Sequence, residues 1–233
     1  TSFRIGAGVG VDLDVETLLG FDSASTVFRI GGLWRFSDNK RHRLDLSWFA
    51  FRRSGSRIVD ETFEYENNQG ETITVEAGAE VDAFFNIDIY QLAYSYSFLQ
   101  DERIDFAANF GLYVMPIEFG IKVEGAVDTE GDANFTAPLP TLGLRLDVAL
   151  TPKWYFRSGS QFFYLEYENF KGSLLSAYSA IEYKPWTHVG IGLSAESFKL
   201  RAEADGDNNF DIDLNGKLEF DYFGLQAYLR LFF

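Results

Sequence analysis

The sequence predicts an all-β fold, a single closed antiparallel barrel with up-and-down topology that takes in residues 1–233. Apolar and polar residues alternate over long stretches with the period of two that marks a β-strand. Short polar turns alternate along the chain with longer connections, as in up-and-down barrels that cross a membrane. The residues opposite the apolar ones are small, with isolated charges among them, which suits the inside of a narrow barrel.

Ten strands are expected from the positions of the turns, with eight and twelve strands as the alternatives. The expected strands are residues 2–13, 26–37, 42–65, 71–99, 103–126, 135–150, 153–168, 172–184, 187–204 and 210–233. The short connections are residues 37–41, 100–102, 151–153 and 184–187. The longer ones are residues 14–25, 66–71, 128–134, 168–171 and 205–209. An even number of strands brings both ends of the chain to the side of the short turns.

A membrane-spanning barrel fits the composition better than a soluble one. No stretch approaches the ~18 consecutive apolar residues of a transmembrane helix, and the mean hydropathy is only −0.10. The remaining structure that satisfies every backbone group in lipid is a closed barrel. The alternative is a soluble lipocalin-like barrel, but the apolar face from Leu142 to Leu150 would be a poor exterior in water.

Aromatic residues cluster beside the short turns, where we expect a girdle at the membrane interface. Its members are Trp34, Phe36, Tyr96, Phe98, Trp154, Phe156, Tyr183 and Trp186. The last strand ends with Leu229, Leu231 and Phe233 on one apolar face, a pattern that resembles the signal read by the outer-membrane assembly machinery. We therefore expect a multi-pass protein of the bacterial outer membrane, with its export signal removed before Thr1.

The charges exclude several classes of partner. With a net charge of −15 the chain is a poor candidate for nucleic acid, which needs clustered Lys and Arg. No Lys or Arg occurs between Arg57 and Arg103, so the hairpin around residues 67–70 should project as an acidic extension into water or beside lipopolysaccharide. Outer-membrane lipid and lipopolysaccharide are thus the expected partners.

No cofactor and no metal centre is predicted. The chain has no cysteine. Residues 205–211 faintly resemble a calcium loop, but Phe210 and Gly216 stand where an EF-hand needs Gly and Glu. Weak binding of divalent cations at acidic loops is the most that this pattern indicates.

Charged residues on the faces opposite the apolar ones are expected to line the interior. They are Arg4, Asp12, Arg29, Arg35, Asp45, Asp105, Arg145, Asp147, Arg157, Glu182, Glu219 and Arg230. Two interpretations stay open. The charges could pair into a core that fills the barrel, or they could line a narrow polar path that selects a small solute.

Enzymatic function is not predicted. Outer-membrane proteases, deacylases and acyltransferases of this kind place a histidine near the outer rim, whereas His42 and His188 directly follow short turns. The motifs of serine hydrolases, zinc proteases and P-loop proteins do not occur in the sequence.

Four segments resemble a family of uncharacterised outer-membrane β-barrel proteins of Gram-negative bacteria. Three are IYQLAYSYSFLQ (89–100), APLPTLGLRLDVALTPKWYFRSGSQFFYLEY (137–167) and EYKPWTHVGIGL (182–193), and a weaker one is LLGFDSASTVFRIGG (18–32). The resemblance implies the fold and the location, but no catalytic residue and no substrate. The expected function is a narrow channel or uptake protein for a small solute. The alternative is a structural or surface-interaction barrel with a filled interior, and an outer-membrane enzyme is the least favoured.

Overall fold

The computed structural model describes residues 2–7, 11–14, 27–58, 60, 62–66, 72–123, 130–167, 170–204 and 216–233. Every regular element in these ranges is a β-strand, so the predicted all-β class is confirmed. The strands are β1 (Ser2–Ala7), β2 (Val11–Asp14), β3 (Phe28–Arg35), β4 (His42–Ile58), β5 (Phe63–Glu66), β6 (Thr72–Val75), β7 (Glu80–Gln100), β8 (Ile104–Val123), β9 (Glu130–Ala149), β10 (Trp154–Tyr167), β11 (Phe170–Trp186), β12 (Val189–Ala204) and β13 (Gly216–Leu231).

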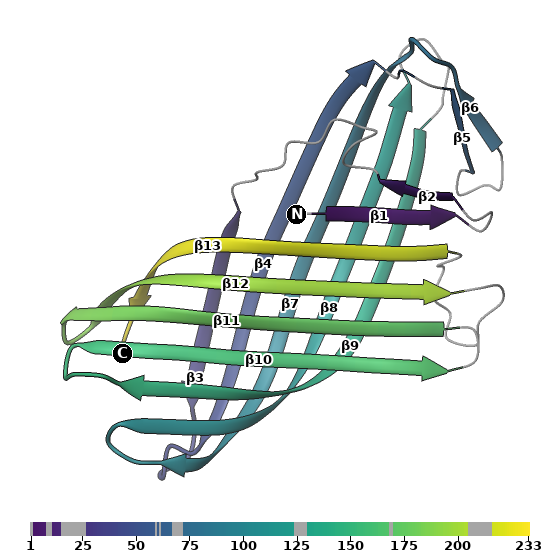
Figure 1. Ribbon diagram of the computed structural model, residues 1–233. Helices are drawn as coiled ribbons and strands as arrows, with labels where there is room; N and C mark the ends of the chain where they lie inside the picture. The colour runs from purple at the N-terminus through teal and green to yellow at the C-terminus, as the bar shows by residue number, and fades with distance from the viewer. Residues whose placement is uncertain are drawn as a thin grey trace.

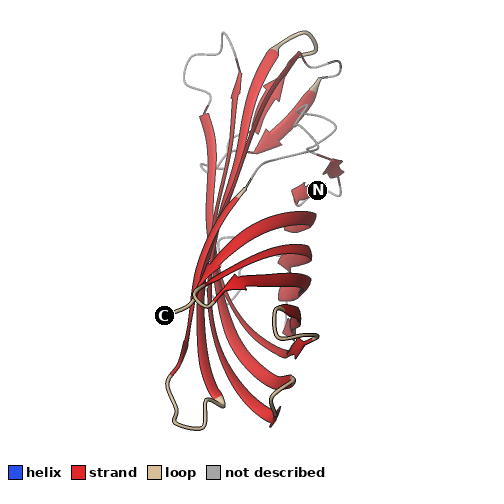
Figure 2. Ribbon diagram, turned by 90° about the vertical axis from the view of Figure 1, so that its left-hand side faces the viewer, coloured by secondary structure: helices blue, strands red, loops and turns tan. Residues whose placement is uncertain are grey.

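Eleven of these strands form one antiparallel sheet in the order β2-β1-β13-β12-β11-β10-β9-β8-β7-β4-β3. From β7 to β13, strands that follow one another in the chain also lie beside one another in the sheet (Figure 1). This order confirms the expected up-and-down topology. The sheet is strongly curled, so that one face is concave and the other convex (Figure 2). Its two ends in the described chain are β2 and β3, and the predicted closure between them is taken up below.

Three of the ten expected strands are each divided in two, and the prediction of single strands there was wrong. The expected strand 2–13 is a hairpin of β1 and β2, with Ala7 paired to Val11. The sequence between them, Gly8-Val9-Gly10, is rich in glycine, which strands disfavour. The expected strand 42–65 ends in a short piece, β5, and the expected strand 71–99 begins with one, β6, and these two pieces pair in a separate two-stranded sheet. Each of the other seven corresponds to one observed strand.

Four short turns join β3 to β4, β7 to β8, β9 to β10 and β11 to β12, all at one end of the sheet, which we call the short-turn end. Local hydrogen bonds hold three of them. The amide of Lys40, with a positive φ of 56°, donates to the carbonyl of Ser37. The carboxylate of Asp101 accepts the amides of Arg103 and Ile104, each at 2.7 Å. The hydroxyl of Thr151 accepts the amide of Trp154 at 3.0 Å. Most of the longer connections fall outside the described residues.

Candidate functional site

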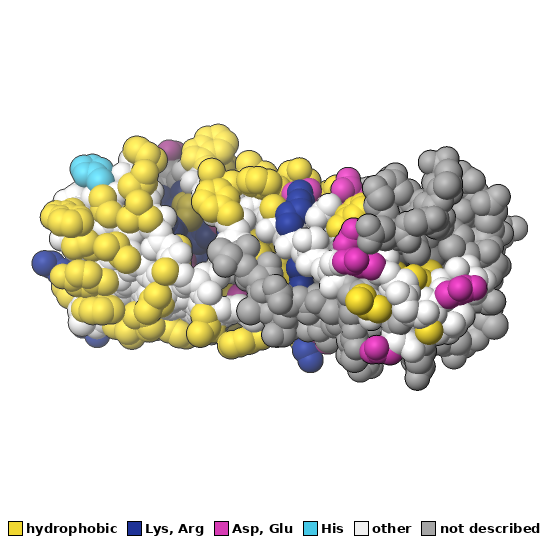
Figure 3. Space-filling model, turned by 90° about the horizontal axis from the view of Figure 1, so that it is seen from above, with side chains coloured by type: hydrophobic (Ala, Val, Ile, Leu, Met, Phe, Trp, Pro, Cys, Tyr) yellow, Lys and Arg dark blue, Asp and Glu magenta, His cyan; other side chains and the backbone are white. Residues whose placement is uncertain are grey.

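The convex face carries an apolar band that begins at the short-turn end. The end of the band is marked on seven strands by a charged residue. It is the first charged residue on the convex face when each strand is followed away from the short turns. These boundary residues are Arg52, Asp88, Glu118, Glu166, Lys171, Lys199 and Asp221. Within the described strands, the convex face between them and the short turns carries no Asp, Glu, Lys or Arg. Figure 3 shows the hydrophobic side chains gathered over one half of the molecule.

Aromatic side chains lie at the edge of this band beside the short turns. Trp34, Trp154 and Trp186 are exposed, and the ring of Trp154 lies 4.8 Å from that of Tyr183. Phe36, Tyr96 and Phe98 are exposed as well, while Phe156 and Tyr183 are half-buried. All eight aromatic residues of the expected girdle are therefore near the short-turn end. The apolar side chains of Leu229, Leu231 and Phe233 are also exposed on the convex face.

The concave face behind the same band holds a cluster of charges. Asp147 lies at its centre and contacts three arginines, with Arg43 and Arg157 each at 3.3 Å and Arg145 closer. Five arginines in this cluster face four carboxylates, which leaves a formal charge of +1. The members are Arg35, Arg43, Arg145, Arg157, Arg230, Asp45, Asp105, Asp147 and Glu182. We call these nine residues the charged layer.

Glu182 and Asp105 complete the pairing of the charged layer. Glu182 is fully buried and accepts hydrogen bonds from Arg157 at 3.0 and 3.1 Å and from the hydroxyl of Tyr228 at 3.2 Å. Asp105 receives Arg35 at 2.5 Å and Arg145 at 3.2 Å. Burying charges costs free energy unless each is paired and hydrogen-bonded, and these carboxylates each contact at least two donors.

A second layer of amide side chains lies next to the charged layer. The amide of Gln91 on β7 donates to Gln161 on β10 at 2.7 Å, and Gln161 donates to Asn109 on β8 at 3.0 Å. The hydroxyl of Ser47 on β4 joins the chain through Gln91 at 3.0 Å. Because β7 and β10 are separated by two strands in the sheet, the bond between Gln91 and Gln161 spans the concave face.

Interior glycines make room for these large side chains. On neighbouring strands Gly159 lies opposite Tyr178, and Gly192 lies opposite Tyr228. A Cβ atom would come within 2.6 Å of the Tyr178 ring at Gly159 and within 2.2 Å of the Tyr228 ring at Gly192. The absence of a side chain at one position of each pair therefore lets a tyrosine lie flat across the neighbouring strand.

A third cluster joins β3 to β12 and β13. Arg29 on β3 contacts both carboxylate oxygens of Glu196 on β12, at 2.7 and 2.8 Å. Glu196 also accepts the hydroxyl of Tyr222 at 2.9 Å and the amide of Gln226 at 3.2 Å, both from β13. The guanidinium of Arg29 lies 4.9 Å from the centre of the Phe49 ring.

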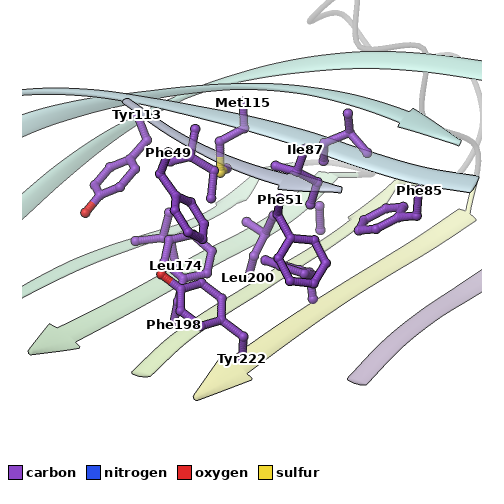
Figure 4. Packing of buried hydrophobic residues seen from close by; sticks show 14 of the residues in the cluster. Phe49, Phe51, Phe85, Ile87, Tyr113, Met115, Leu174, Phe198, Leu200 and Tyr222 are labelled. Atoms are coloured by element: carbon purple, nitrogen blue, oxygen red, sulfur yellow. The ribbon is translucent and has the colours of Figure 1, made fainter. Parts of the chain in front are cut away.

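Farther from the short turns the concave face becomes apolar. Phe49, Phe51, Phe198, Phe220 and Tyr222 pack ring against ring with centroids 5.5 to 6.1 Å apart. Figure 4 shows ten members of this aromatic core, which come from β4, β7, β8, β11, β12 and β13 and point toward one another. They are Phe49, Phe51, Phe85, Ile87, Tyr113, Met115, Leu174, Phe198, Leu200 and Tyr222.

The polarity of the sheet therefore inverts along its length. Near the short turns the convex face is apolar and the concave face is charged, whereas beyond the boundary residues the convex face carries charged residues and the concave face holds the aromatic core, with the buried Arg53 beside the ring of Phe51. The inversion appears in the sequence as a change in the phase of the alternation. On β13 the apolar residues are Phe220 and Tyr222 on the concave face and then Phe223 and Leu225 on the convex face.

Nine of the twelve charged residues expected in the interior lie on the concave face and join the clusters described above. The side chains of Arg4 and Asp12 lie outside the described part of the chain. The prediction for Glu219 was wrong, because the phase of the alternation on β13 puts it on the convex face, where Arg201 contacts it at 3.6 Å. Arg43 and Glu196 were missed, although each lies on a concave-face position within the same alternation.

The two histidines lie at the short-turn end. His42 begins β4 and its Nδ1 lies 2.6 Å from the hydroxyl of Tyr94 on the convex face, and His188 is in the two-residue turn before β12. Among the residues that the structure describes, no group of three His, Asp or Glu side chains is placed to hold a metal ion. The possible cation loop at residues 205–211 lies outside those residues. No helix in the described chain is long and apolar enough to cross a membrane.

Comparisons of the chain with protein-family models, with curated proteins and with solved structures gave no match. The expected relation to a family of outer-membrane barrels therefore stays a prediction from the segments quoted above.

Proposed function

We propose that the chain is an integral β-barrel of the bacterial outer membrane, whose filled interior makes it a rigid anchor for a projecting extension. The inversion of polarity carries this proposal. A sheet that is apolar outside and charged inside suits lipid, and one that is charged outside and apolar inside suits water. Both arrangements occur in succession on the same strands, so the boundary residues would lie at the outer surface of the membrane.

The height of the apolar band supports a single crossing of a bilayer. On β13 the band runs from Phe223 to Leu231 and on β8 from Ile104 to Pro116. At ~3.3 Å per residue and a strand tilt of ~40°, these lengths correspond to roughly 20–30 Å along the membrane normal. An apolar band of about 25 Å is usual for outer-membrane barrels.

Closure of the sheet between its two ends is part of the proposal. In lipid, each backbone N–H or C=O group that is left unpaired at an open sheet edge costs several kcal/mol, because no water is present to hydrogen-bond it. The ion pair from Arg29 on β3 to Glu196 on β12 already draws the two sides of the sheet together. The short turns would face the periplasm, the longer connections and acidic segments would face lipopolysaccharide, and the C-terminal strand would be recognised by the assembly machinery.

The filled interior favours a structural or surface-interaction role over an open pore. The charged layer, the amide layer and the aromatic core follow one another along the concave face and are held by contacts between side chains of distant strands. The part beyond the lipid, including β5 and β6, would then be a platform for contacts at the cell surface. Enzymatic activity is not part of the proposal.

A narrow channel for a small solute is the second candidate. The observation that favours it is the excess of one arginine in the charged layer, together with the buried Nε atom of Arg145, which has no partner within the described chain. These are the groups that would guide a small anion if the layer opened. Conductance in a planar bilayer separates the two candidates. The structural role predicts a flat trace for the wild-type chain, and steady anion-selective steps would favour the channel instead.

Cysteine labelling tests the membrane location itself, because the chain has no cysteine of its own. Leu193 and Lys199 lie on the same face of β12, on either side of the proposed boundary. In liposomes, Lys199→Cys should react with a membrane-impermeant thiol reagent and Leu193→Cys should be protected. In unfolded protein both should react alike, which is the control. Equal reaction of the two variants in folded, reconstituted protein would refute the proposal.

A further inference from the structure

A shallow groove interrupts the apolar band on the convex face of β10, β11 and β12, which lie side by side in Figure 1. Six small side chains form it, in two rows that run across the three strands. They are Ser158, Ser160, Ala177, Ser179, Ala195 and Ser197. The groove has a volume of about 370 Å³. Because the side chains are small, the backbone of the strands forms its floor.

Large apolar side chains bound the groove. Leu144 and Leu146 on β9 form one wall, and Phe223 and Leu225 on β13 form the other, with Leu225 79% exposed. A second hollow of about 430 Å³ shares Ser179 and Ala195 with the first and continues toward the short turns. The two together make a continuous track with large apolar side chains along its walls, from the middle of the band toward the short-turn end.

The turns at the end of this track carry lysine side chains. The chain segments there are residues 150–156, 183–193 and 226–233, and they contain no Asp or Glu. They carry Lys153 and Lys184, whereas Arg230 in the last segment belongs to the charged layer on the concave face and contacts Glu182 there. Lys153 is exposed in its turn, next to the paired rings of Trp154 and Tyr183. The other two short turns combine both signs, with Asp38 beside Lys40 and Arg41, and with Asp101 and Glu102 before Arg103.

We propose that this face is a binding site for an anionic phospholipid of the inner leaflet, with one acyl chain in the groove and the phosphate at the cationic end. The inference rests on the proposed membrane location. Lys and Arg near a membrane surface attract anionic lipid, and Trp and Tyr rings favour the depth of the glycerol backbone. An apolar track that leads to such an end matches both parts of a phospholipid.

A second copy of the chain is the competing occupant, and the charges argue against it. Two copies that pack through this groove about an axis along the membrane normal would place their cationic ends next to each other, and like charges at close range repel. A phospholipid with a negative headgroup neutralises the same cluster.

Native mass spectrometry of the full chain in detergent tests the inference, with phosphatidylglycerol and phosphatidylcholine as probes. The wild-type chain should retain one phosphatidylglycerol and bind phosphatidylcholine at least tenfold more weakly. Ala177→Phe fills the groove and should weaken retention of phosphatidylglycerol at least tenfold. Its control, Ala108→Phe, adds the same ring to the convex face of β8 outside the groove and should bind like wild type. Ser160→Leu serves as a second groove variant if Ala177→Phe does not fold.

The cationic end is tested in the same way. Lys153→Gln should reduce the preference for phosphatidylglycerol over phosphatidylcholine several-fold, whereas Lys40→Gln in another short turn should leave it unchanged. Equal retention by Ala177→Phe and Ala108→Phe would overturn the inference, and so would a wild-type dimer that Ala177→Phe dissociates. If Leu193→Cys is protected in liposomes while lipid retention is insensitive to the groove, the membrane location stands and the lipid site alone fails.

Discussion

Arg29 and Glu196 form a two-point ion pair at 2.7 and 2.8 Å although 167 residues separate them in the chain. Arg29 is on β3, at one end of the curled sheet, and Glu196 is on β12, near the other. No hydrogen-bonded ladder between β3 and β12 occurs in the described chain, so this side-chain contact is a direct link across the concave face.

Loss of one member of this pair should destabilise the fold strongly. Arg29→Met leaves the buried carboxylate of Glu196 without its cation, and such changes cost about 3–5 kcal/mol. Chemical unfolding in lipid vesicles measures the change. The double variant Arg29→Met with Glu196→Gln should recover much of the loss, because no unpaired charge remains. A loss below about 1 kcal/mol for Arg29→Met would contradict the role of the pair in holding the sheet.

Gly192→Ala should also destabilise the fold, for a steric reason. The added Cβ would lie 2.2 Å from the ring of Tyr228, and overpacking of this kind typically costs about 1–3 kcal/mol. The matched control is Gly32→Ala on β3, where no atom lies within 4 Å of the new Cβ. The second change Tyr228→Ala should partly rescue Gly192→Ala in an unfolding assay. Equal stability of the two glycine variants would show that the ring can move aside.

The alternation of the sequence predicted most of the fold and most of the charged layer. Asp105, Arg145 and Asp147 were placed on the inner face because apolar residues flank each of them in the sequence. Glu219 was misplaced because the phase of the alternation changes at Tyr222 and Phe223, where the interior turns apolar. Which charges pair with which could not be predicted, since the partners of Asp147 come from strands that the curl of the sheet brings together.

The local sequence pattern also could not predict which of the expected strands are divided in two. The segment 71–99 alternates nearly throughout, so that the period of two does not mark where β6 ends and β7 begins. In the segment 42–65 the alternation is lost at residues 48–57, but β4 continues through these residues to Ile58, so that the loss does not mark the end of β4 either. The turn before β7 contains Gly78 with a φ of 91°, a conformation that glycine adopts readily, and this glycine is the one local sign of a break. β5 and β6 pair with each other in a sheet of their own, and this pairing depends on the whole hairpin from β4 to β7 rather than on the local sequence.

The turn between β7 and β8 should respond to pH through Asp101. The backbone amide of Ile104 donates a hydrogen bond to the carboxylate of Asp101, and the amide of Arg103 donates a second one. These bonds hold the pKa of Asp101 below its ordinary value of about 3.9. A carboxylate with a lowered pKa in the folded state contributes stability above its ordinary pKa and loses it as the pH falls through the folded value. NMR titration of Asp101 should therefore give a midpoint below about 3.9, the ordinary value for an aspartate side chain. A midpoint at or above about 3.9 would contradict the two hydrogen bonds.

Replacement of Asp147 should disturb the charged layer more than any other single change there. Asp147→Asn leaves Arg43, Arg145 and Arg157 around a neutral side chain, and their mutual repulsion should loosen the layer. We expect a loss of about 3–5 kcal/mol in unfolding experiments and, in planar bilayers, anion-selective steps that the wild-type chain lacks. The control is Asp88→Asn, which removes a carboxylate on the convex face beside Arg52 and should leave the trace flat. A flat trace for both variants, with folded protein in the bilayer, would show that the amide layer and aromatic core block the interior without help from the charges.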